Sequence, residues 1–472
     1  MSTTADDDLA FAPLAEVSRR IKARELTSAA LTRLMLDRIA RLNPTLNCFI
    51  TVCADAAMAQ AEALDRLLQS GLDLGPLHGV PVAVKDNMAT AGVRTTAASR
   101  ILADWVPDED ATVVQRLKQA GAVILGKTNL YEFAYGGVHE DYGETRNPWN
   151  LGRTCSASSS GPACAVAAGL AYASLGTDTG GSVRLPAAAC GIVGHKPTYG
   201  LVSRAGVVPA GYSLDHVGPF ARTVRDTALV LNAIAGPDPR DPAGSRRAAP
   251  DVASDLGRGI GGLVIGVPKR QPSELIDPQM HDAFVAALAV LEREGAALVE
   301  LTLPDHLLSR TAMWAISASE LAESHREYLR TRAQDYSPTV RGLVRQGAFL
   351  PAVEYVHAHR VRQKIIADYK AVMRHVDVLA MPVVPLPAWP IGAEEVTVAN
   401  VTENLMGSLT RYCPPFNITG QPAIAVPSGF DHEGLPLGFQ IAGRWHEEAM
   451  VFRVARAYEQ ATDWHRRRPP LQ

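Results

Sequence analysis

The sequence predicts an α/β fold, a large mixed and mostly parallel β-sheet covered by helices on both faces. Apolar runs of strand length alternate along the chain with amphipathic segments of helical length. This alternation is typical of sheets that are buried on both sides. The chain has 472 residues, of which 47% are hydrophobic, so it can bury a large core in one domain or in several smaller ones.

The individual elements follow from the pattern in chain order. Leu31, Met35, Ile39 and Leu42 recur at helical spacing, which predicts a helix that ends near Pro44. Further helices are predicted at 54–69, 110–120 and 163–171. Strands are predicted at 47–52, 80–84, 122–125, 171–175, 263–268, 376–382, 423–427 and 437–442. The stretch 235–262 is rich in proline, glycine and charge, which favours a surface loop or a boundary between subregions.

Composition and charge exclude several classes of protein. The net charge of −3 shows no basic footprint for nucleic acid. The six cysteines follow no metal-ligand spacing, so we expect no metal site and reduced thiols in a cytoplasmic protein. The N-terminal sequence MSTTADDDLA has no apolar signal-peptide core, and no apolar run reaches the length of a membrane span. We therefore expect neither nucleic acid nor membrane as a partner.

The helix predicted at 110–120 leads into a sequence that fits a nucleotide-binding pattern. Asp110 is placed to cap this helix and Gly121 to end it. Residues 121–128, GAVILGKT, match G-x-x-x-x-G-K-[ST]. A working phosphate loop turns tightly and continues into a helix, whereas Ala-Val-Ile-Leu is typical of a buried strand. The match is a coincidence of composition, and we expect no cofactor.

The glycine-rich stretch ASLGTDTGGSVRLPAAACG, residues 173–191, is the first candidate for chemistry. Two glycines precede Ser182 between nearly uncharged apolar runs. A strand that ends in a turn presenting a serine and several free amides suits acyl transfer, because the serine attacks a carbonyl carbon and the amides bind the oxyanion. The alternative is that the glycines only permit a tight turn.

A base for this serine is found at the end of another predicted strand. There is no G-x-S-x-G elbow, and the histidines at 195, 216, 357 and 359 carry no local signature. Lys85 follows the apolar run VPVAV, where burial would lower its pKa and leave a neutral amine. The alternative is a strand-end lysine that reaches solvent. The hydroxyl cluster TCSASSSG, residues 154–161, is either part of this site or a polar loop that caps a helix.

Several long motifs in a fixed order resemble the amidase signature family. They are VPVAVKDN, GKTNLYEFAYGG, TRNPWN, the serine cluster, GTDTGGSVRLPAAACGIVGHKPTYGLVSRAGVVP and SLDHVGPFARTVRD, followed near the C-terminus by PPFNITGQPAIAVPSG and LPLGFQIAG. The resemblance covers about residues 25–245 and 375–465. It implies one amidase-signature domain over 1–472. Its parts are an N-terminal helical part (1–75), the catalytic core (76–245), a variable helical region that forms the substrate pocket or a lid (246–375), and a C-terminal part that returns to the sheet (376–472).

The resemblance implies a Ser–Ser–Lys triad. Ser182 matches the nucleophile and Lys85 the general base. Ser158 matches the bridging serine that follows a cis peptide bond and passes the proton between them. The implied oxyanion hole consists of the backbone amides of Thr179, Gly180, Gly181 and Ser182. The residues implied to support this network are Ser159, Asp178 and Arg184.

The serine cluster departs from the family pattern. The family writes GGSSGGS, whereas residues 156–162 read SASSSGP, with Ala157 in place of the glycine before the bridging serine. A cis bond at a non-proline site costs about 3–4 kcal/mol, and a side chain on Ala157 leaves it less room. We assign the bridging role to Ser158 by alignment, with Ser159 as the alternative. Cys155 beside the loop is a rival nucleophile.

The resemblance implies hydrolysis of a carboxylic amide, with aryl esters and carbamates (urethanes) as related substrates, through an acyl-enzyme on Ser182. One alternative is the glutaminase subunit of a tRNA-dependent amidotransferase, in which an acidic residue before the PxN segment is expected to hold glutamine's amino group. Here Thr410 and Arg411 precede Pro415-Phe416-Asn417, and YEFAYGGVHEDY at 131–142 also differs. The second alternative is a catalytically silent binding protein.

Substrate choice depends on variable loops that line the pocket. The sequence gives the residue types in these loops but not which side chains face the substrate. Large side chains in these regions are candidates for the pocket lining, although each also suits an ordinary core. The candidates are Met88, Tyr135, Trp314 and Trp389. The expected partner is a small-molecule amide, ester or carbamate, and a homodimer is the default for a soluble enzyme.

Overall fold

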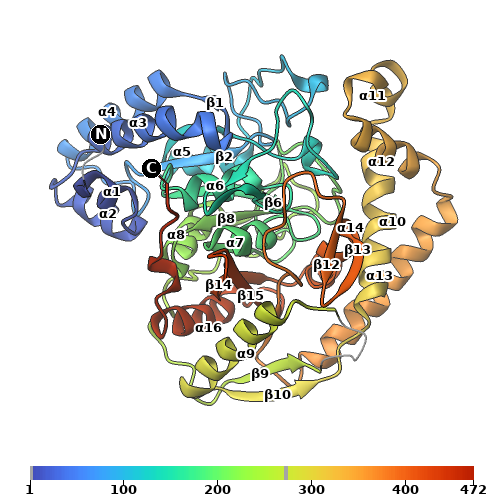
Figure 1. Ribbon diagram of the computed structural model, residues 1–472. Coiled ribbons are helices and arrows are strands. Elements are labelled where there is room, and N and C mark those ends of the chain that lie inside the picture. Colours follow the sequence, from blue (N-terminus) through green and yellow to red (C-terminus); the bar gives the residue numbers. More distant parts are fainter. Residues whose placement is uncertain (1–3, 270–274, 472) are drawn as a thin grey trace.

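A large twisted β-sheet forms the centre of the molecule (Figure 1). The computed structural model describes residues 4–269 and 275–471. Within this part, the sheet has 11 strands in the order β1-β3-β2-β6-β8-β7-β14-β15-β11-β9-β10. Strand β2 lies parallel to β3 and β6, strand β9 lies parallel to β10 and β11, and the other neighbours are antiparallel. The predicted α/β fold with a mixed sheet is confirmed.

Apolar sequence runs form the strands of this sheet. They are β1 (Phe49–Val52), β2 (Pro81–Lys85), β3 (Val123–Thr128), β6 (Ala173–Asp178), β7 (Val193–Lys196), β8 (His216–Ala221), β9 (Val264–Pro268), β10 (Ala297–Leu301), β11 (Val378–Pro382), β14 (Ala423–Phe430) and β15 (Pro436–Gly443). Two small hairpins lie outside it, β4 (Arg146–Asn147) with β5 (Asn150–Thr154) and β12 (Glu395–Val398) with β13 (Val401–Asn404).

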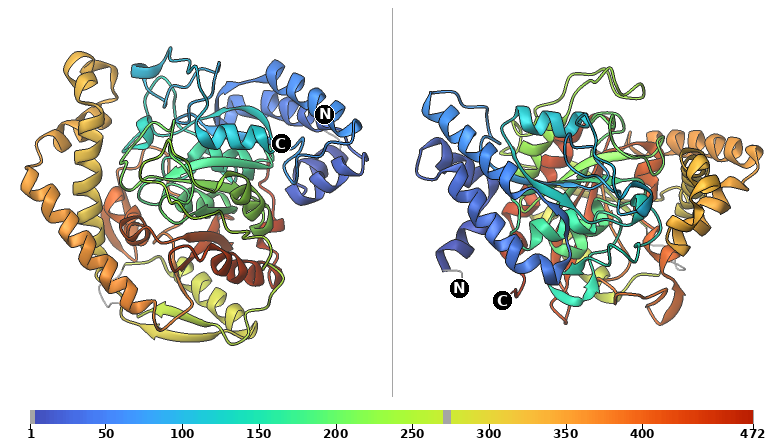
Figure 2. Two further views of the ribbon diagram at one scale, coloured as in Figure 1. Left: turned by 180° about the vertical axis from the view of Figure 1, so that it is seen from behind. Right: turned by 90° about the horizontal axis from the view of Figure 1, so that it is seen from above.

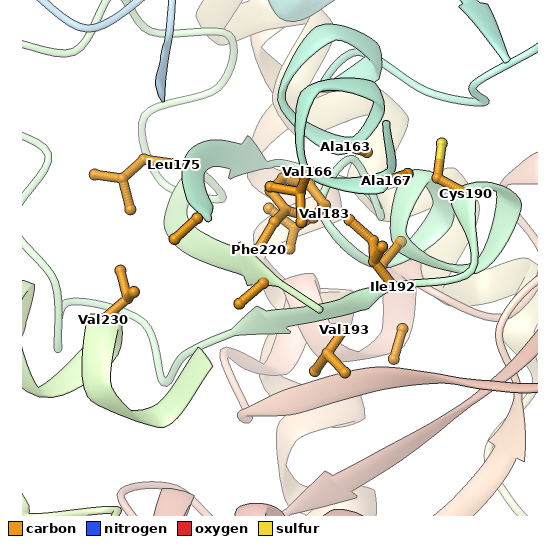
Figure 3. Close-up of a cluster of buried hydrophobic side chains, with 14 of the residues drawn as sticks. Ala163, Val166, Ala167, Leu175, Val183, Cys190, Ile192, Val193, Phe220 and Val230 are labelled. Atoms are coloured by element: carbon orange, nitrogen blue, oxygen red, sulfur yellow. The ribbon is translucent and has the colours of Figure 1, made fainter. Parts of the chain in front are cut away.

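Helices cover both faces of the sheet. The helices α6 (Ser160–Ala167) and α7 (Arg184–Cys190) contact each other and one face, while α8 (Val224–Ile234), α9 (Pro278–Arg293) and α16 (Glu448–Gln460) form a contacting row on the other. Figure 3 shows the core where α6 and α7 pack on the strands β7 and β8, with Val166, Val183 and Phe220 close together. Small side chains let α6 approach closely, since a Cβ atom on Gly161 would lie 2.4 Å from the backbone oxygen of Asn129.

Two helical groups flank the sheet at opposite ends of the molecule (Figure 2). The N-terminal group contains α1 (Thr4–Ala10), α2 (Leu14–Lys22), α3 (Ser28–Leu46) and α4 (Ala54–Gln69). The opposite group contains α10 (His306–Ser324), α11 (Arg326–Thr331), α12 (Pro338–Ala348) and α13 (Ala352–Val372). The remaining α-helices are α5 (Thr112–Gln119), α14 (Leu405–Leu409) and α15 (Pro414–Thr419). Among the described residues, no helix is both long and apolar enough to cross a bilayer.

Several local expectations differ from the structure. Asp110 does not cap α5, which begins after Ala111, because its carboxylate binds the ammonium of Lys118 and the backbone amide of Ala91. The GAVILGKT segment supplies strand β3, as expected for a buried strand. Region 246–375 is not only helical, because it contributes the strands β9 and β10 to the main sheet.

Candidate active site

Lys85 ends strand β2 with its side chain completely buried. Its Nζ atom lies 2.9 Å from the Oγ atoms of Ser158 and Ser159 and 2.8 Å from Oγ1 of Thr177. Burial lowers the pKa of Lys85 to about 7, although the charges of Asp215 and Asp178 oppose this shift. A neutral amine has two N–H groups and one lone pair, which matches three hydroxyl neighbours.

The serine loop before helix α6 distinguishes its two candidate bridging serines. The hydroxyl of Ser159 donates to the carbonyl of Thr177 at 3.0 Å and accepts from the backbone amide of Thr177 at 3.3 Å, so it is tied to strand β6. The backbone amide of Ser158 lies 3.3 Å from Oγ of Ser182, and Ser158 lines the adjacent cavity. This arrangement favours Ser158 over Ser159 for the bridging role.

The bond before Ser158 is not cis, in contrast to the family pattern. None of the peptide bonds in the described part of the chain is cis. The loop turns instead at Ser156, whose φ of 65° lies in the left-handed region. With Ala157 in place of a glycine, the trans arrangement avoids the cost of a non-proline cis bond.

The GTDTGGS turn directs Ser182 into a cavity. Gly181 has a φ of 128°, which only glycine adopts readily. Its amide donates to Oδ1 of Asp178 at 2.8 Å, so it is already occupied. The amides of Thr179, Gly180 and Ser182 have no protein acceptor among the described residues. These three amides therefore remain as candidates for the oxyanion hole.

A buried ion pair holds this turn in place. The guanidinium of Arg184 binds both carboxylate oxygens of Asp178 at 3.0 and 3.1 Å. Burial alone would raise the pKa of Asp178, but the Arg184 charge holds it well below its usual range. Asp178 accepts the amides of Gly181 and Val183, and thus aligns the backbone on either side of Ser182.

The C-terminal part of the chain completes the support of this ion pair, through Asn417 on α15 and Gln440 on β15. The side-chain amide of Asn417 donates to Oδ1 of Asp178 at 2.7 Å, and its oxygen accepts from Arg184 at 2.7 Å. Gln440 on β15 accepts from Arg184 at 2.9 Å. Sequence reasoning quoted the segments that contain Asn417, Gln440, Thr177 and Asp215 as family motifs but gave none of these four residues a role in the site. Asp215 accepts the hydroxyl of Thr179 at 2.6 Å.

The cavity in front of Ser182 has a volume of about 520 Å³ and is mainly apolar. It is bounded by the serine loop and the GTDTGGS turn on one side. Helices α10, α12 and α14, together with Thr410, bound the rest. Tyr135 and Trp314 line it, and Trp314 is 39% exposed at its edge. Arg310 is the one charged side chain among the described lining residues. No carboxylate lines the cavity within the described part.

Other predicted residues lie away from this cavity. Met88 is fully buried in the core, where it bridges to Val207. Trp389 is buried beside the β4–β5 hairpin. Its backbone carbonyl accepts a hydrogen bond from the amide of Thr154 at the end of β5. Cys155 is wholly buried, and burial raises the pKa of its thiol. Its place in the core argues against a nucleophilic role. Among the described residues, no cluster of His, Cys, Asp or Glu could hold a metal ion.

Comparison with known proteins defines the class. The family model for amidases matches residues 30–452, so this chain belongs to the amidase family. It is 41% identical to the A subunit of the glutamyl-tRNA(Gln) amidotransferase of Thermosynechococcus vestitus, over 97% of this chain and 99% of the relative. A relative of the same name from Roseiflexus is 42% identical over 97% and 98%.

Solved structures of several activities share the fold. A structure described as a vestigial protein complex that reveals the evolutionary origins of an s-triazine catabolic enzyme matches with a TM-score of 0.91 and 34% identity over 95% of this chain and 98% of that one. A bacterial aryl acylamidase of the amidase signature family matches with a TM-score of 0.89 and 26% identity over 97% of both chains. The A subunit of the glutamyl-tRNA(Gln) amidotransferase from Thermotoga maritima matches with a TM-score of 0.79 and 35% identity over 96% and 95%.

These findings correct the expected partners. From the family resemblance we expected a small-molecule amide, ester or carbamate and a homodimer by default, and from the net charge we expected no nucleic acid. The curated relatives match this chain along almost their full lengths and are named as subunits of a tRNA amidotransferase. A related structure is also described as part of a protein complex. Net charge was a poor guide because it averages over the whole surface and conceals local patches.

Proposed function

We propose that this chain cleaves a carboxylic amide C–N bond through an acyl-enzyme on Ser182. The observation that carries this proposal is the buried amine of Lys85, which contacts Oγ of Ser158 at 2.9 Å while the amide of Ser158 contacts Oγ of Ser182. A pKa of about 7 leaves about half of this lysine neutral near pH 7. It can therefore accept a proton without help from a histidine.

The proposed reaction moves one proton through two hydroxyls. As Oγ of Ser182 forms a bond to the carbonyl carbon, its proton passes to Ser158, and the Ser158 proton passes to Nζ of Lys85. The free amides of the GTDTGGS turn bind the oxyanion. When the C–N bond breaks, the proton returns through Ser158 to the leaving nitrogen. Water then releases the acyl group by the same route.

The first candidate for the amide is glutamine, in a subunit that passes ammonia to a partner. The names of the curated relatives and their full-length match support this candidate better than a stand-alone hydrolase. Arg310 in the cavity suits the carboxylate of glutamine. Glutamine as the substrate is opposed by one feature, because the described lining has no carboxylate to bind its amino group.

The second candidate is a hydrolase for an amide with an apolar acyl or leaving group. Its support is the lining of the cavity, where aromatic and aliphatic side chains outnumber polar ones and Arg310 is the single charge described. The likeness to an aryl acylamidase is in line with this candidate. A substrate that combines an apolar group with one carboxylate would fit both features.

One experiment separates these candidates. The purified chain is given glutamine, with ammonia as the readout, and separately an aryl anilide, with release of the aniline as the readout. Ser182→Ala is tested beside Ser254→Ala, an exposed serine in the loop after α8. Turnover of glutamine alone favours the amidotransferase role, and turnover of the anilide alone favours the hydrolase. The proposal requires that Ser182→Ala abolishes either activity and that Ser254→Ala does not.

A fluorophosphonate probe covers the case in which both substrates fail. Labelling of the wild-type chain but not of Ser182→Ala would show a reactive serine that needs another substrate or a partner protein. Failure to label the wild type under forcing conditions would contradict the proposal and favour a catalytically silent binding protein.

A further inference from the structure

A second cavity, of about 680 Å³, lies where the two ends of the chain meet. Its walls come from the segment between α1 and α2, the start of α8 and the residues after α16. Figure 1 shows these parts side by side near the labels N and C, and Figure 2 agrees. The cavity lies at the far end of β8 from the candidate active site, since Ala221 pairs with Ala173 while His216 pairs with Asp178.

Arginine side chains dominate the lining of this second cavity, which we call the basic cavity. They are Arg19, Arg222, Arg225, Arg456, Arg466 and Arg468. Its acidic lining residues in the described part are only Glu16 and Asp226. Positive charges around one space repel each other, and this repulsion falls where a carboxylate or a bound anion lies among them.

Arg222 is the central group because it is buried without a carboxylate partner. Its side chain is 7% exposed and directly follows β8. One nitrogen, Nη2, donates to the backbone carbonyls of His465 at 3.2 Å and Arg467 at 3.5 Å. Its Nε and Nη1 atoms have no acceptor among the described residues. Burial and the neighbouring charge of Arg468 lower the pKa of Arg222 to about 10.

The aromatic ring of Phe11 gathers guanidinium groups on this wall. The guanidinium carbon of Arg222 lies 4.8 Å from the ring centroid and that of Arg468 lies 5.1 Å from it. Stacking on a ring holds a guanidinium in a fixed plane and leaves its N–H edge free to bind an anion. The basic cavity thus presents orientated donors.

The nearby carboxylates are already occupied. Asp226 accepts the first backbone amides of α2, from Leu14 at 3.0 Å and Ala15 at 2.9 Å. Other acids bind arginines at the edge, in the pairs Glu16–Arg19, Glu25–Arg19, Glu459–Arg456 and Asp8–Arg468. Arg225 and Arg466 are exposed, and no carboxylate of the described chain lies within ion-pair distance of them. An excess of positive charge therefore remains.

We propose that the basic cavity binds the phosphate group of a small anion. Planar guanidinium groups bind tetrahedral phosphate oxygens through paired hydrogen bonds, and Arg222 offers such an edge from a buried position. The volume exceeds that of one phosphate, so the cavity has room for a diphosphate or a small phosphate ester. Bound phosphate would connect three parts of the chain that line the basic cavity: the start of α8, the segment after α16 and the N-terminal helices.

Calorimetric titration of the full chain with pyrophosphate and with inorganic phosphate tests this proposal, at constant ionic strength set with sodium chloride. We expect saturable binding with a dissociation constant below about 1 mM and an increase in the melting temperature. Saturation by both anions would assign a site for one phosphate group, and saturation by pyrophosphate alone would assign a diphosphate site. The absence of heat or stabilisation above the chloride control would overturn the proposal.

Variants localise the binding. The double variant Arg225→Gln/Arg466→Gln removes two exposed charges without disturbing the core, and we expect it to weaken pyrophosphate binding at least tenfold. Arg222→Lys keeps the charge but loses the planar edge, and the same loss is expected. Arg330→Gln, an exposed arginine on α11, serves as the control. Equal affinity in all three variants, or equally tight binding of succinate to the wild type, would refute a phosphate site here.

Discussion

The Nζ atom of Lys85 lies 2.9 Å from Oγ of Ser158, and no carboxylate of the described residues contacts it. A buried ammonium at this place would need a counter-charge, whereas a neutral amine needs only hydroxyl partners. The contact between Lys85 and Ser158 therefore favours the neutral amine of Lys85 over its ammonium form.

Replacing Lys85 tests its role as the base. We expect Lys85→Met to lower kcat by about 10²- to 10⁴-fold, the usual contribution of general acid–base catalysis. Steady-state kinetics on whichever amide proves to be the substrate measures this effect. The control is Lys118→Met, which replaces a partly exposed lysine on α5 that forms an ion pair with Asp110. Retention of wild-type kcat in Lys85→Met would exclude the lysine as base.

The pKa of Lys85 predicts the pH dependence of activity. Because burial lowers this pKa to about 7 and only the neutral amine can accept the proton, kcat/KM should rise as the pH increases through about 7 and then level off. The charged form prevails below this range and is inactive. A pH–rate profile between about pH 5 and 9 measures the midpoint. A profile that falls over this interval would contradict the assignment.

The two neighbouring serines should differ in effect. Ser158→Ala removes the hydroxyl next to Ser182, and we expect a loss in kcat of about 10²-fold or more. Ser159→Ala removes a hydroxyl that is tied to Thr177 on β6, so we expect a smaller loss. Parallel kinetics of the two variants provide the comparison. If Ser159→Ala proves the more harmful, the bridging roles are exchanged.

Removing the carboxylate of Asp178 should destabilise the whole chain. Asp178→Asn leaves the buried charge of Arg184 without its partner, a change that typically costs about 3–5 kcal/mol. Chemical denaturation followed by circular dichroism measures the loss. Glu327→Gln removes the exposed partner of Arg330, and its unfolding midpoint should match that of the wild type. A midpoint for Asp178→Asn equal to that of the control would show that the ion pair adds nothing.

Arg310 should govern selectivity for substrates with a carboxylate. We expect Arg310→Met to raise KM for such an amide about 10- to 100-fold, in line with the loss of a charge-assisted hydrogen bond. The KM of its neutral analogue should change little. Paired measurements on an acid and its methyl ester test this, and an equal change for both would remove Arg310 from substrate recognition.

Most strands of the sheet and the position of Lys85 were predictable because they depend on local patterns, whereas the strands β7, β8 and β10 were not predicted. VPVAV is apolar throughout and ends in a lysine, so a buried strand with an amine at its end follows from the sequence alone. The contacts of Arg184 with Asn417 and Gln440 were not predictable, because these residues lie 233 and 256 residues away and their family motifs do not show what they contact. Asp110 shows the opposite error, because its carboxylate binds the ammonium of Lys118 and the amide of Ala91 instead of capping α5 as the local rule predicts.

The cavity lining was predictable only in part. Tyr135 and Trp314 line the cavity whereas Met88 and Trp389 lie elsewhere, and the four are alike in being large and apolar. Whether such a side chain faces a cavity or the core depends on how distant helices pack, and α10 is brought to the serine loop only by the tertiary fold. Residue type alone cannot separate the two environments.

The support of Arg184 has a consequence for the order in which the protein is made. Lys85, Ser158 and Ser182 all leave the ribosome in the first 182 residues, but Asn417 and Gln440 follow only in the last sixth of synthesis. A nascent chain therefore holds its reactive groups long before the turn that carries Ser182 is locked. Because α15 and β15 are synthesised late, a chain that ends before them would contain Lys85, Ser158 and Ser182 but lack the side chains of Asn417 and Gln440 that hold Arg184.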